Sequence, residues 1–312
     1  MMDDKKINLI HGDCIELMPT IPTESVDCLL TDPPYLYLKN QKLDKSFDEI
    51  KFFNESKRIL KPNGVIMMFG RGTSFYRWNT QLADLGFTFK EEIVWDKSYC
   101  TSPLMAISRV HETISIYTKG KGVINRVKVP YLEMKGGDIG SIVQDINRMK
   151  VILKNTRSLD AVLDYLENNV RDTSDMQCPN SPIIRTDYYD CDTSTRFQIT
   201  KTRHTRTGDR AANVAQSMTS GMNEKTIIKQ PRDHYATIHP TQKPVRLLER
   251  LLALTTKEGD VVLDPFAGSF STGEACINTG RKFIGIEIDD EYFAGGENRI
   301  ANILSGNLFN QN

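Results

Sequence analysis

Long hydrophobic runs are absent from this chain of 312 residues. No apolar stretch approaches the roughly 18 residues that a membrane-spanning helix needs, so we expect no membrane partner. The first ten residues, MMDDKKINLI, contain no long apolar segment, so we also expect no secretory signal. The six cysteines lie far apart, which disfavours both a disulfide framework and a zinc site. These absences predict a folded protein with reduced thiols in the cytoplasm and no bound metal.

Net charge is absent as well, because 40 basic and 40 acidic residues cancel. Taken alone, this balance argues against a nucleic-acid partner. The charges are unevenly spread, however, and eight lysines and arginines lie between Arg196 and Arg232 against only two acidic residues. Such a local basic stretch is typical of a surface that binds a phosphate backbone, and a solvated polar loop is the alternative interpretation.

Short apolar strands alternate with amphipathic helices at both ends of the chain. Candidate strands in the first part cover residues 7–10, 26–30, 65–69, 87–95 and 112–118. This alternation is typical of an α/β fold with a doubly wound, mostly parallel sheet covered by helices on both faces. The middle of the chain is polar apart from a candidate helix after Ser158, and the strand–helix pattern returns at residue 239. We therefore expect three segments, at residues 1–119, 120–238 and 239–312.

A glycine-bearing turn follows a candidate strand near the C-terminus. The strand ends at Asp264, the turn contains Gly268, and the next strand ends at Glu287. A turn that admits a ligand to the backbone, with an acid on the following strand, is the plan of a nucleotide-type site at the carboxyl edge of a sheet. The middle glycine of the dinucleotide fingerprint is missing and no Gly-Lys-Ser/Thr follows, so a pyrophosphate site and a P-loop are both disfavoured. A purely structural turn is the alternative.

A second constellation, Asp32-Pro33-Pro34-Tyr35, ends a candidate buried strand. The two prolines fix an extended backbone, since proline sets its own φ angle and restricts the residue before it. A carboxylate, carbonyl groups and an aromatic ring are then held together, which suits an exocyclic amino group on a stacked base. The alternative is a strand-ending turn with a packed tyrosine.

Together and in this order, the two constellations resemble the amino-group DNA methyltransferases that use S-adenosylmethionine, in the permuted class called beta. HGD at 11–13, RILKPNG at 58–64, HETISIYTK at 111–119, HPTQKP at 239–244 and LDPFAGS at 263–269 also fit the family. The resemblance covers roughly residues 7–119 and 239–300. It implies a circularly permuted, Rossmann-like methyltransferase sheet with the catalytic half first, an inserted target recognition region and the cofactor half last.

The resemblance also implies a role for individual residues. Asp32 and the Pro33 carbonyl would hold the target amino nitrogen, Pro34 would shape the turn, and Tyr35 would stack on a base flipped out of duplex DNA. Asp13 would contact the adenine of the cofactor and Glu287 its ribose hydroxyls. The residues implied on the methionine side are Asp264, Phe266, Gly268 and Ser269, with Thr241 and Lys243.

The target recognition region would bind double-stranded DNA through its basic residues. The implied contacts are Arg196, Lys201, Arg203, Arg206 and Arg210. A homodimer and a cognate restriction endonuclease are further partners that the family resemblance leaves open. One departure from the family concerns Phe270, which stands where a glycine is usual. Its side chain either narrows the cofactor pocket or points away from it.

The predicted activity is methyl transfer to the N6 amino group of adenine, because the Asp-Pro-Pro-Tyr form of the motif goes mainly with adenine. Cytosine N4 is the first alternative, since a serine in place of the aspartate is more usual there. A small-molecule methyltransferase is a second alternative, and the basic insertion argues against it. A catalytically inactive DNA-binding homologue is a third, and the intact motif at 32–35 argues against that.

Overall fold

The computed structural model describes most of the two ends of the chain and parts of its middle. The described residues are 6–35, 46–99, 106–136, 138, 140–145, 148, 213–233, 238–239 and 241–306. They divide into two compact units, of which the first combines Met1–Val127 with Lys225–Asn312 and the second is Lys128–Glu224. The first unit therefore joins the two ends of the chain.

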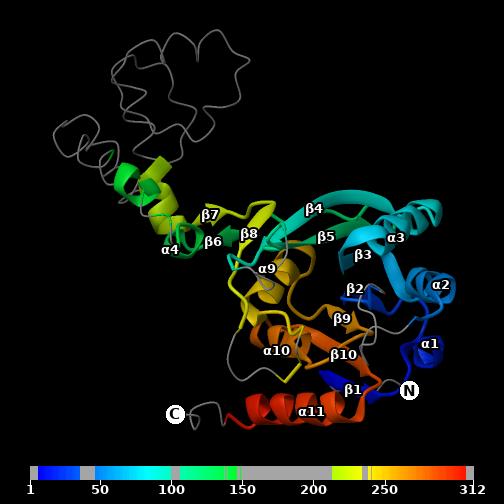
Figure 1. The fold of residues 1–312 in the computed structure, drawn as a ribbon. Helices are drawn as coiled ribbons and strands as arrows, with labels where there is room; N and C mark the ends of the chain where they lie inside the picture. Colours follow the sequence, from blue (N-terminus) through cyan, green and yellow to red (C-terminus); the bar gives the residue numbers. More distant parts are fainter. Residues whose placement is uncertain are drawn as a thin grey trace. The chain divides into compact units, whose positions relative to one another are not determined.

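An eight-stranded sheet forms the centre of the first unit (Figure 1). Its strand order is β1-β10-β9-β2-β3-β5-β4-β8. In chain order the strands are β1 (Ile7–His11), β2 (Val26–Thr31), β3 (Leu60–Gly70), β4 (Thr88–Asp96), β5 (His111–Thr118), β8 (Ile227–Lys229), β9 (Val261–Asp264) and β10 (Lys282–Glu287). All neighbouring pairs are parallel except those of β5, which runs antiparallel to both β3 and β4.

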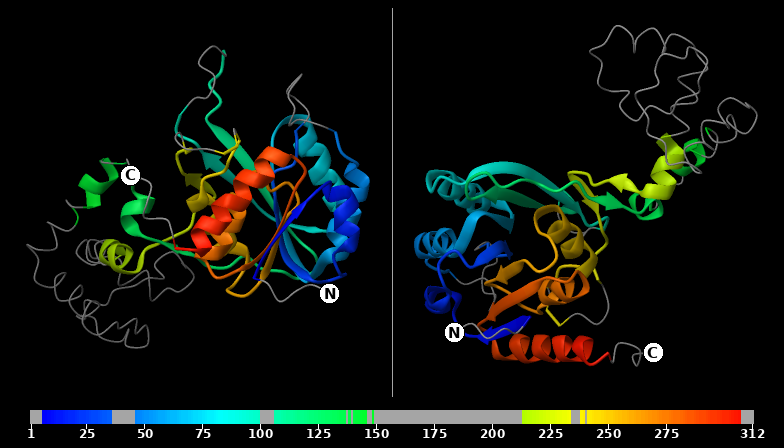
Figure 2. Two further views of the ribbon diagram at one scale, coloured as in Figure 1. Left: turned by 90° about the horizontal axis from the view of Figure 1, so that it is seen from below. Right: turned by 180° about the vertical axis from the view of Figure 1, so that it is seen from behind.

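Both faces of the sheet bury apolar side chains, as the continuous apolar strands predicted. Along β3, Val65, Met67 and Phe69 enter one core while Ile66 and Met68 enter the other, because successive side chains of a strand point to opposite faces. The first core is covered by α9 (Val245–Thr255), α10 (Ser271–Asn278) and α11 (Asp290–Leu304). The second is covered by α1 (Cys14–Leu17), η1 (Met18–Thr20), α2 (Glu49–Ile59) and α3 (Gly72–Asp84). Figure 2 shows these helices from two further sides of the sheet.

Aspartates cap the N-termini of several of these helices. The Asp13 side chain accepts a hydrogen bond from the Ile15 amide at the start of α1, and Asp48 accepts one from the Lys51 amide at the start of α2. A carboxylate at this position satisfies backbone donors that the helix leaves open. Asp289 caps α11 in the same way.

The boundaries of the middle segment differ from the predicted ones. The segment at 120–238 was expected to be an insertion, but β8 lies within it and pairs with β4 of the main sheet. The three residues of β8 are too few for a sequence pattern to reveal. In the second unit, the described elements include β6 (Lys128–Val129), α4 (Tyr131–Met134) and β7 (Met222–Asn223). The candidate helix after Ser158 lies outside the described residues.

Strand direction decides which residues meet at the functional edge. The carboxyl ends of β1, β2, β3, β9 and β10 share one edge of the sheet because these strands are parallel neighbours. Since β5 is reversed, its amino end, beginning at His111, lies at that same edge. In the part of the chain that the structure describes, no helix combines the length and apolar character needed to span a membrane.

Candidate active site

A cavity of about 380 Å³ lies within the first unit, at the carboxyl edge of the parallel strands. This volume falls in the range of small-molecule sites, roughly 300–1,000 Å³. All of the residues predicted for catalysis and for cofactor contact line it. They are Asp13, Asp32, Pro33, Pro34, Tyr35, Thr241, Lys243, Asp264, Phe266, Gly268, Ser269 and Glu287. The two constellations recognised in the sequence therefore form one site.

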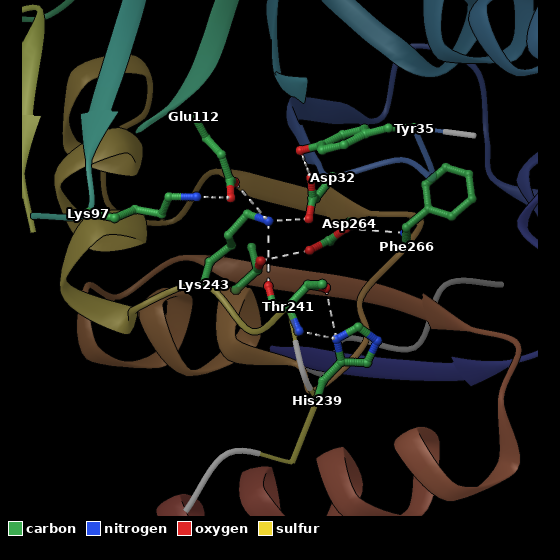
Figure 3. Close-up of polar contacts among 10 residues, drawn as sticks. Asp32, Tyr35, Lys97, Glu112, His239, Thr241, Lys243, Asp264 and Phe266 are labelled. Carbon is green, nitrogen blue, oxygen red and sulfur yellow. Dashed lines mark hydrogen bonds and ion pairs between the residues drawn. The ribbon is translucent and has the colours of Figure 1, made fainter. Parts of the chain in front are cut away.

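Asp32 follows the last residue of β2 and directs its carboxylate toward two donors (Figure 3). Its Oδ2 accepts a hydrogen bond from Lys243 Nζ, and its Oδ1 accepts one from the hydroxyl of Tyr35. Burial raises the pKa of Asp32, and the Lys243 ammonium and the tyrosine hydroxyl oppose that rise. The carboxylate is thus held on both oxygens by groups of the protein.

Lys243 lies between two carboxylates and is buried. Its Nζ contacts Asp32 Oδ2 and lies 3.4 Å from Glu112 Oε2. The ammonium also lies 4.9 Å from the centre of the Phe69 ring. Burial disfavours the charged form, but Asp32 and Glu112 outweigh burial and raise the pKa of Lys243. This lysine was predicted on the methionine side of the cofactor, and in the structure it lines the cavity while bonded to Asp32.

Sequence reasoning missed Glu112 and Lys97 as members of the site. Glu112 stands near the amino end of the reversed strand β5, and Lys97 follows β4 directly. Lys97 Nζ donates a 3.0 Å hydrogen bond to Glu112 Oε1. Burial of Glu112 is outweighed by Lys243 and Lys97, which lower its pKa to about 2. Glu112 lies within the recognised run at 111–119 and Lys97 lies in no recognised motif, and only the strand order brings both to the edge of the sheet that carries Asp32 and Lys243.

Tyr35, the last residue of the Asp32–Tyr35 turn, is held by its backbone and its ring. Its carbonyl accepts a 2.8 Å hydrogen bond from Ser74 Oγ on α3. Its ring lies 6.2 Å from that of Trp78, between ring centres, and is half-buried. Phe47, which also lines the cavity, lies 6.1 Å from Trp78 and 5.2 Å from Phe266. An aromatic wall thus borders the side of the cavity next to Asp32.

Glu287 ends β10 and contacts the glycine-bearing turn. Its Oε2 accepts a 2.7 Å hydrogen bond from the Gly268 amide and its Oε1 a 2.8 Å bond from the Asp289 amide. Gly268 has a φ angle of +52°, in the left-handed region that favours glycine. A carboxylate oxygen with one backbone donor retains capacity for another, so Glu287 can still accept hydroxyl groups from a ligand. Burial raises the pKa of Glu287.

Asp264 ends β9 on the opposite side of the turn. Its Oδ1 accepts a 3.2 Å hydrogen bond from the Phe266 amide and its Oδ2 a 2.6 Å bond from the Thr272 hydroxyl. Burial outweighs these bonds and raises the pKa of Asp264 to about 7. Asp264 is therefore poised to change its charge near neutral pH when a cationic group approaches.

The start of the cofactor half also reaches the cavity. Thr241 donates its amide to His239 Nδ1 at 3.2 Å, and its Oγ1 lies 3.0 Å from the same nitrogen. Burial lowers the pKa of His239 to about 4, so its ring is neutral at physiological pH. Ser269 Oγ lies 3.2 Å from Arg299 Nη1 on α11. His239 was not predicted as a site residue, although it opens the recognised run at 239–244.

Phe270 points away from the cavity. Its side chain is fully buried in the core under α9, α10 and α11, and it is not among the residues that line the cavity. Its ring lies 6.3 Å from that of Phe283 and 5.8 Å from that of Phe293. Two glycines, Gly285 and Gly296, leave the space that the ring fills. Of the two orientations that the sequence left open, the structure shows the one that keeps the pocket clear.

The residues predicted to contact DNA, Arg196, Lys201, Arg203, Arg206 and Arg210, lie outside the described residues. Their role stays a prediction. Within the described ranges, no group of three or more histidine, cysteine, aspartate or glutamate side chains is arranged to hold a metal ion.

Comparison with known proteins gives matches over most of the chain. A family model described as DNA methylase matches residues 26–298. The DNA adenine methyltransferase YhdJ of Escherichia coli (strain K12) is 30% identical over 300 residues, covering 94% of this chain and 82% of that protein. The Type II methyltransferase M2.DpnII of Streptococcus pneumoniae is 25% identical over 317 residues, covering 95% and 90% respectively.

Solved structures share the fold. The M1.HpyAVI–SAM complex superposes with a TM-score of 0.52 at 21% identity, covering 94% of this chain and 99% of that chain. PvuII DNA methyltransferase, described as cytosine-N4-specific, superposes with a TM-score of 0.55 at 15% identity, covering 96% and 92%. At such identities the likeness shows the fold alone.

Proposed function

The chain belongs to the DNA methylase family, and from that premise we propose that it methylates the N6 amino group of adenine in duplex DNA. Family membership confirms the predicted enzyme class, DNA methyltransferase, and DNA as its substrate. The predicted cofactor, S-adenosylmethionine, is confirmed as the methyl donor of the family. The predicted fold class is confirmed by the mostly parallel sheet and by the solved structures that share it.

One observation carries the proposal. Asp32-Pro33-Pro34-Tyr35, at the end of β2, lines the same cavity as Asp264, Gly268 and Glu287, at the ends of β9 and β10. A site for an amino group therefore adjoins a site of nucleoside type. The aspartate at position 32 and the 30% identity to a protein described as a DNA adenine methyltransferase favour adenine over cytosine.

The cavity suits S-adenosylmethionine in its chemistry. Glu287 retains acceptor capacity for ribose hydroxyls, and the positive φ angles of Gly12 and Gly268 let a ligand approach the backbone. Asp13, which caps α1, and Asp264 both line the cavity, which supports the proposal that Asp13 contacts the adenine and Asp264 attracts the positive charges of the methionine part. When bound, the cofactor supplies an electrophilic methyl group on a sulfonium centre.

The residues beside Asp32 act on the base. Asp32 and the Pro33 carbonyl accept the two hydrogens of the amino group, which frees the nitrogen lone pair from conjugation and orients it. Positioning of this kind contributes roughly 7–11 kcal/mol to lowering a barrier. The amino group is out of reach inside duplex DNA, so the base is flipped out at a cost of a few kcal/mol and stacks on Tyr35.

The deciding experiment is single-molecule sequencing of DNA from cells that express the protein, against an empty-vector control. N6-methyladenine in a defined sequence is the expected result. N4-methylcytosine would keep the site and overturn the target base. An absence of modification with a folded protein that binds S-adenosylmethionine would favour the inactive DNA-binding homologue.

Replacing Tyr35 by alanine is expected to weaken capture of the target base and to spare the cofactor. Base–aromatic stacking contributes about 1–3 kcal/mol, so KM for DNA should rise about 5- to 150-fold while Kd for S-adenosylmethionine stays within about twofold. Tyr35→Phe is the matched control, because it keeps the ring and removes only the hydroxyl that bonds Asp32. Steady-state kinetics and calorimetry measure the two effects. Equal weakening of DNA and cofactor would contradict the role given to Tyr35.

Affinity for the cofactor is expected to fall as pH falls through 7. The carboxyl group of Asp264, with a pKa near 7 caused by burial, is ionised above that pH and neutral below it. The ionised form attracts the positive charges of the cofactor, so protonation weakens binding by up to about tenfold per pH unit below 7. Calorimetric titrations between pH 6 and 7.5 test this. Asp264→Asn should bind more weakly and flatten the dependence, whereas an unchanged slope in that variant would assign the effect to another group.

The proposal also extends to the partners and the location of the protein. The name Type II methyltransferase, carried by one relative, favours a search for a cognate restriction endonuclease, and a homodimer is tested by the mass of the protein in solution. The cytoplasm is the location that fits a DNA substrate. The basic residues at 196–210 are proposed as phosphate contacts, so DNA affinity should weaken steeply as salt is raised.

A further inference from the structure

We propose that Glu112 and Lys97 are positioning residues for methyl transfer, because through Lys243 they fix the direction and the charge of the Asp32 carboxylate. This inference rests on the proposed function of the site. Lys97 follows β4 and Glu112 lies on the neighbouring strand β5, and both side chains lie on the side of Asp32 away from Tyr35 (Figure 3).

The four side chains form a row of alternating charge. Lys97 Nζ contacts Glu112 Oε1 at 3.0 Å, Glu112 Oε2 lies 3.4 Å from Lys243 Nζ, and Lys243 Nζ contacts Asp32 Oδ2. Lys97, at one end of the row, has a side chain 4% exposed and does not line the cavity, whereas Asp32, at the other end, is 23% exposed and lines it. The row therefore begins in the protein interior and ends at the reacting position.

The contacts of Lys243 fix the direction of Asp32. Lys243 Nζ donates hydrogen bonds to Asp32 Oδ2 and, at 3.5 Å, to the Thr241 carbonyl, and Glu112 Oε2 lies 3.4 Å away as an ion-pair partner without a hydrogen bond. Without Glu112 the ammonium would lose one of the two carboxylates that attract it and define its position. The oxygen that Lys243 holds is Oδ2, which leaves Oδ1, the atom bonded by Tyr35, for the target amino group.

The charges around Asp32 come from every element packed against it. The charged groups are Lys243 ahead of α9, Glu112 on β5 and Asp264 at the end of β9, and the neutral titratable groups are the His239 ring and the Tyr35 hydroxyl. Lys97 acts one step further away, because it neutralises Glu112. Removing Glu112 leaves Asp32 as the one carboxylate of the row that pairs with Lys243. Removing Lys97 takes away the second lysine partner of Glu112, so Glu112 attracts Lys243 more strongly. The two changes thus alter the environment of Asp32 in opposite senses.

A general loss of structure would not shift the pH dependence of the two variants in opposite directions, so these opposite effects can be tested. The rate of a single turnover with saturating DNA and S-adenosylmethionine is measured against pH for the wild type, Glu112→Gln and Lys97→Met. The acid limb of the pH–rate profile, where the rate falls as pH falls, should move to lower pH by about one unit in Glu112→Gln. In Lys97→Met it should move to higher pH by a smaller amount. The rate on the plateau should fall about tenfold in both, with Kd for S-adenosylmethionine within about twofold of the wild type.

Two further variants complete the design. Lys61→Met removes a lysine–carboxylate pair at the opposite edge of the sheet, where Lys61 Nζ contacts Asp27 at 2.7 Å, and should leave the profile unchanged. Lys97→Arg keeps the charge and should return the acid limb to its wild-type position, which tests the proposal even if Lys97→Met does not fold. Unchanged acid limbs in both charge-removing variants, or shifts in one direction, would overturn it. A wild type that leaves DNA unmodified would instead overturn the proposed function.

Discussion

Replacing Asp32 by asparagine is expected to lower the rate of methyl transfer about a thousandfold and to leave cofactor binding within about threefold of the wild type. The variant keeps the size of the side chain and removes its charge. Losing a positioned acceptor or charge at a reacting group typically costs 10²- to 10⁴-fold in rate. Glu287, which is implied in cofactor contact, accepts hydrogen bonds from the Gly268 and Asp289 amides, and these bonds do not involve Asp32.

The change also leaves Lys243 with Glu112 as its remaining carboxylate partner among the contacts described for it. A buried ammonium that loses a partner is costly, so the free energy of unfolding should fall in parallel. Asp27→Asn is the matched control, since Asp27 lies on the same strand and pairs with Lys61 at the other edge of the sheet. Single-turnover assays and calorimetry separate the two effects. Because the asparagine amide oxygen can still accept a hydrogen bond, retained activity in Asp32→Asn would show that methyl transfer does not need the charge of Asp32.

Much of the fold follows from patterns within single segments. Apolar runs such as residues 26–30 and 65–69 predict strands buried on both faces, and the structure puts their alternate residues into two separate cores. The site was predictable for a related reason. Parallel strands bring their carboxyl ends to one edge, so residues that end strands, such as Asp264 and Glu287, meet there.

The parts that were not predicted depend on strand direction and on packing between distant segments. Glu112 is the second residue of β5, and only the reversal of that strand brings it to the edge of the sheet where Asp32 follows β2. Lys243 carries no sign in the sequence that its ammonium turns toward Asp32, 211 residues away. Likewise, the three residues of β8 join the sheet because β4 offers a free edge, which no local pattern encodes.

Phe270 departs from the family pattern, and the structure explains this departure by the packing of its ring against Gly285 and Gly296. The residue has a φ angle of +54° and directs its ring between β10 and α11. A Cβ atom on Gly296 would lie 2.0 Å from Phe270 Cδ2, and one on Gly285 would lie 2.6 Å from Phe270 Cε1. The ring therefore occupies space that these two glycines leave empty.

Replacing Gly296 by alanine is expected to destabilise the wild type by about 1–3 kcal/mol, because the added methyl group meets the ring. In α11 the same change should otherwise stabilise by about 0.8–1 kcal/mol, since alanine favours a helix over glycine. The sign of the effect should therefore reverse in a Phe270→Ala background, which itself loses about 3–5 kcal/mol by opening a cavity. Urea unfolding of the four proteins in this double-mutant cycle measures the coupling.

Cofactor binding supplies the second readout of the cycle. Because Phe270 lies in the core and the cavity is lined by its neighbours Ser269 and Ser271, folded Phe270→Ala should bind S-adenosylmethionine within about threefold of the wild type. Additive effects of Gly296→Ala and Phe270→Ala on stability would contradict the packing relationship. A large gain or loss of cofactor affinity in Phe270→Ala would instead show that the ring shapes the pocket through the turn that carries it.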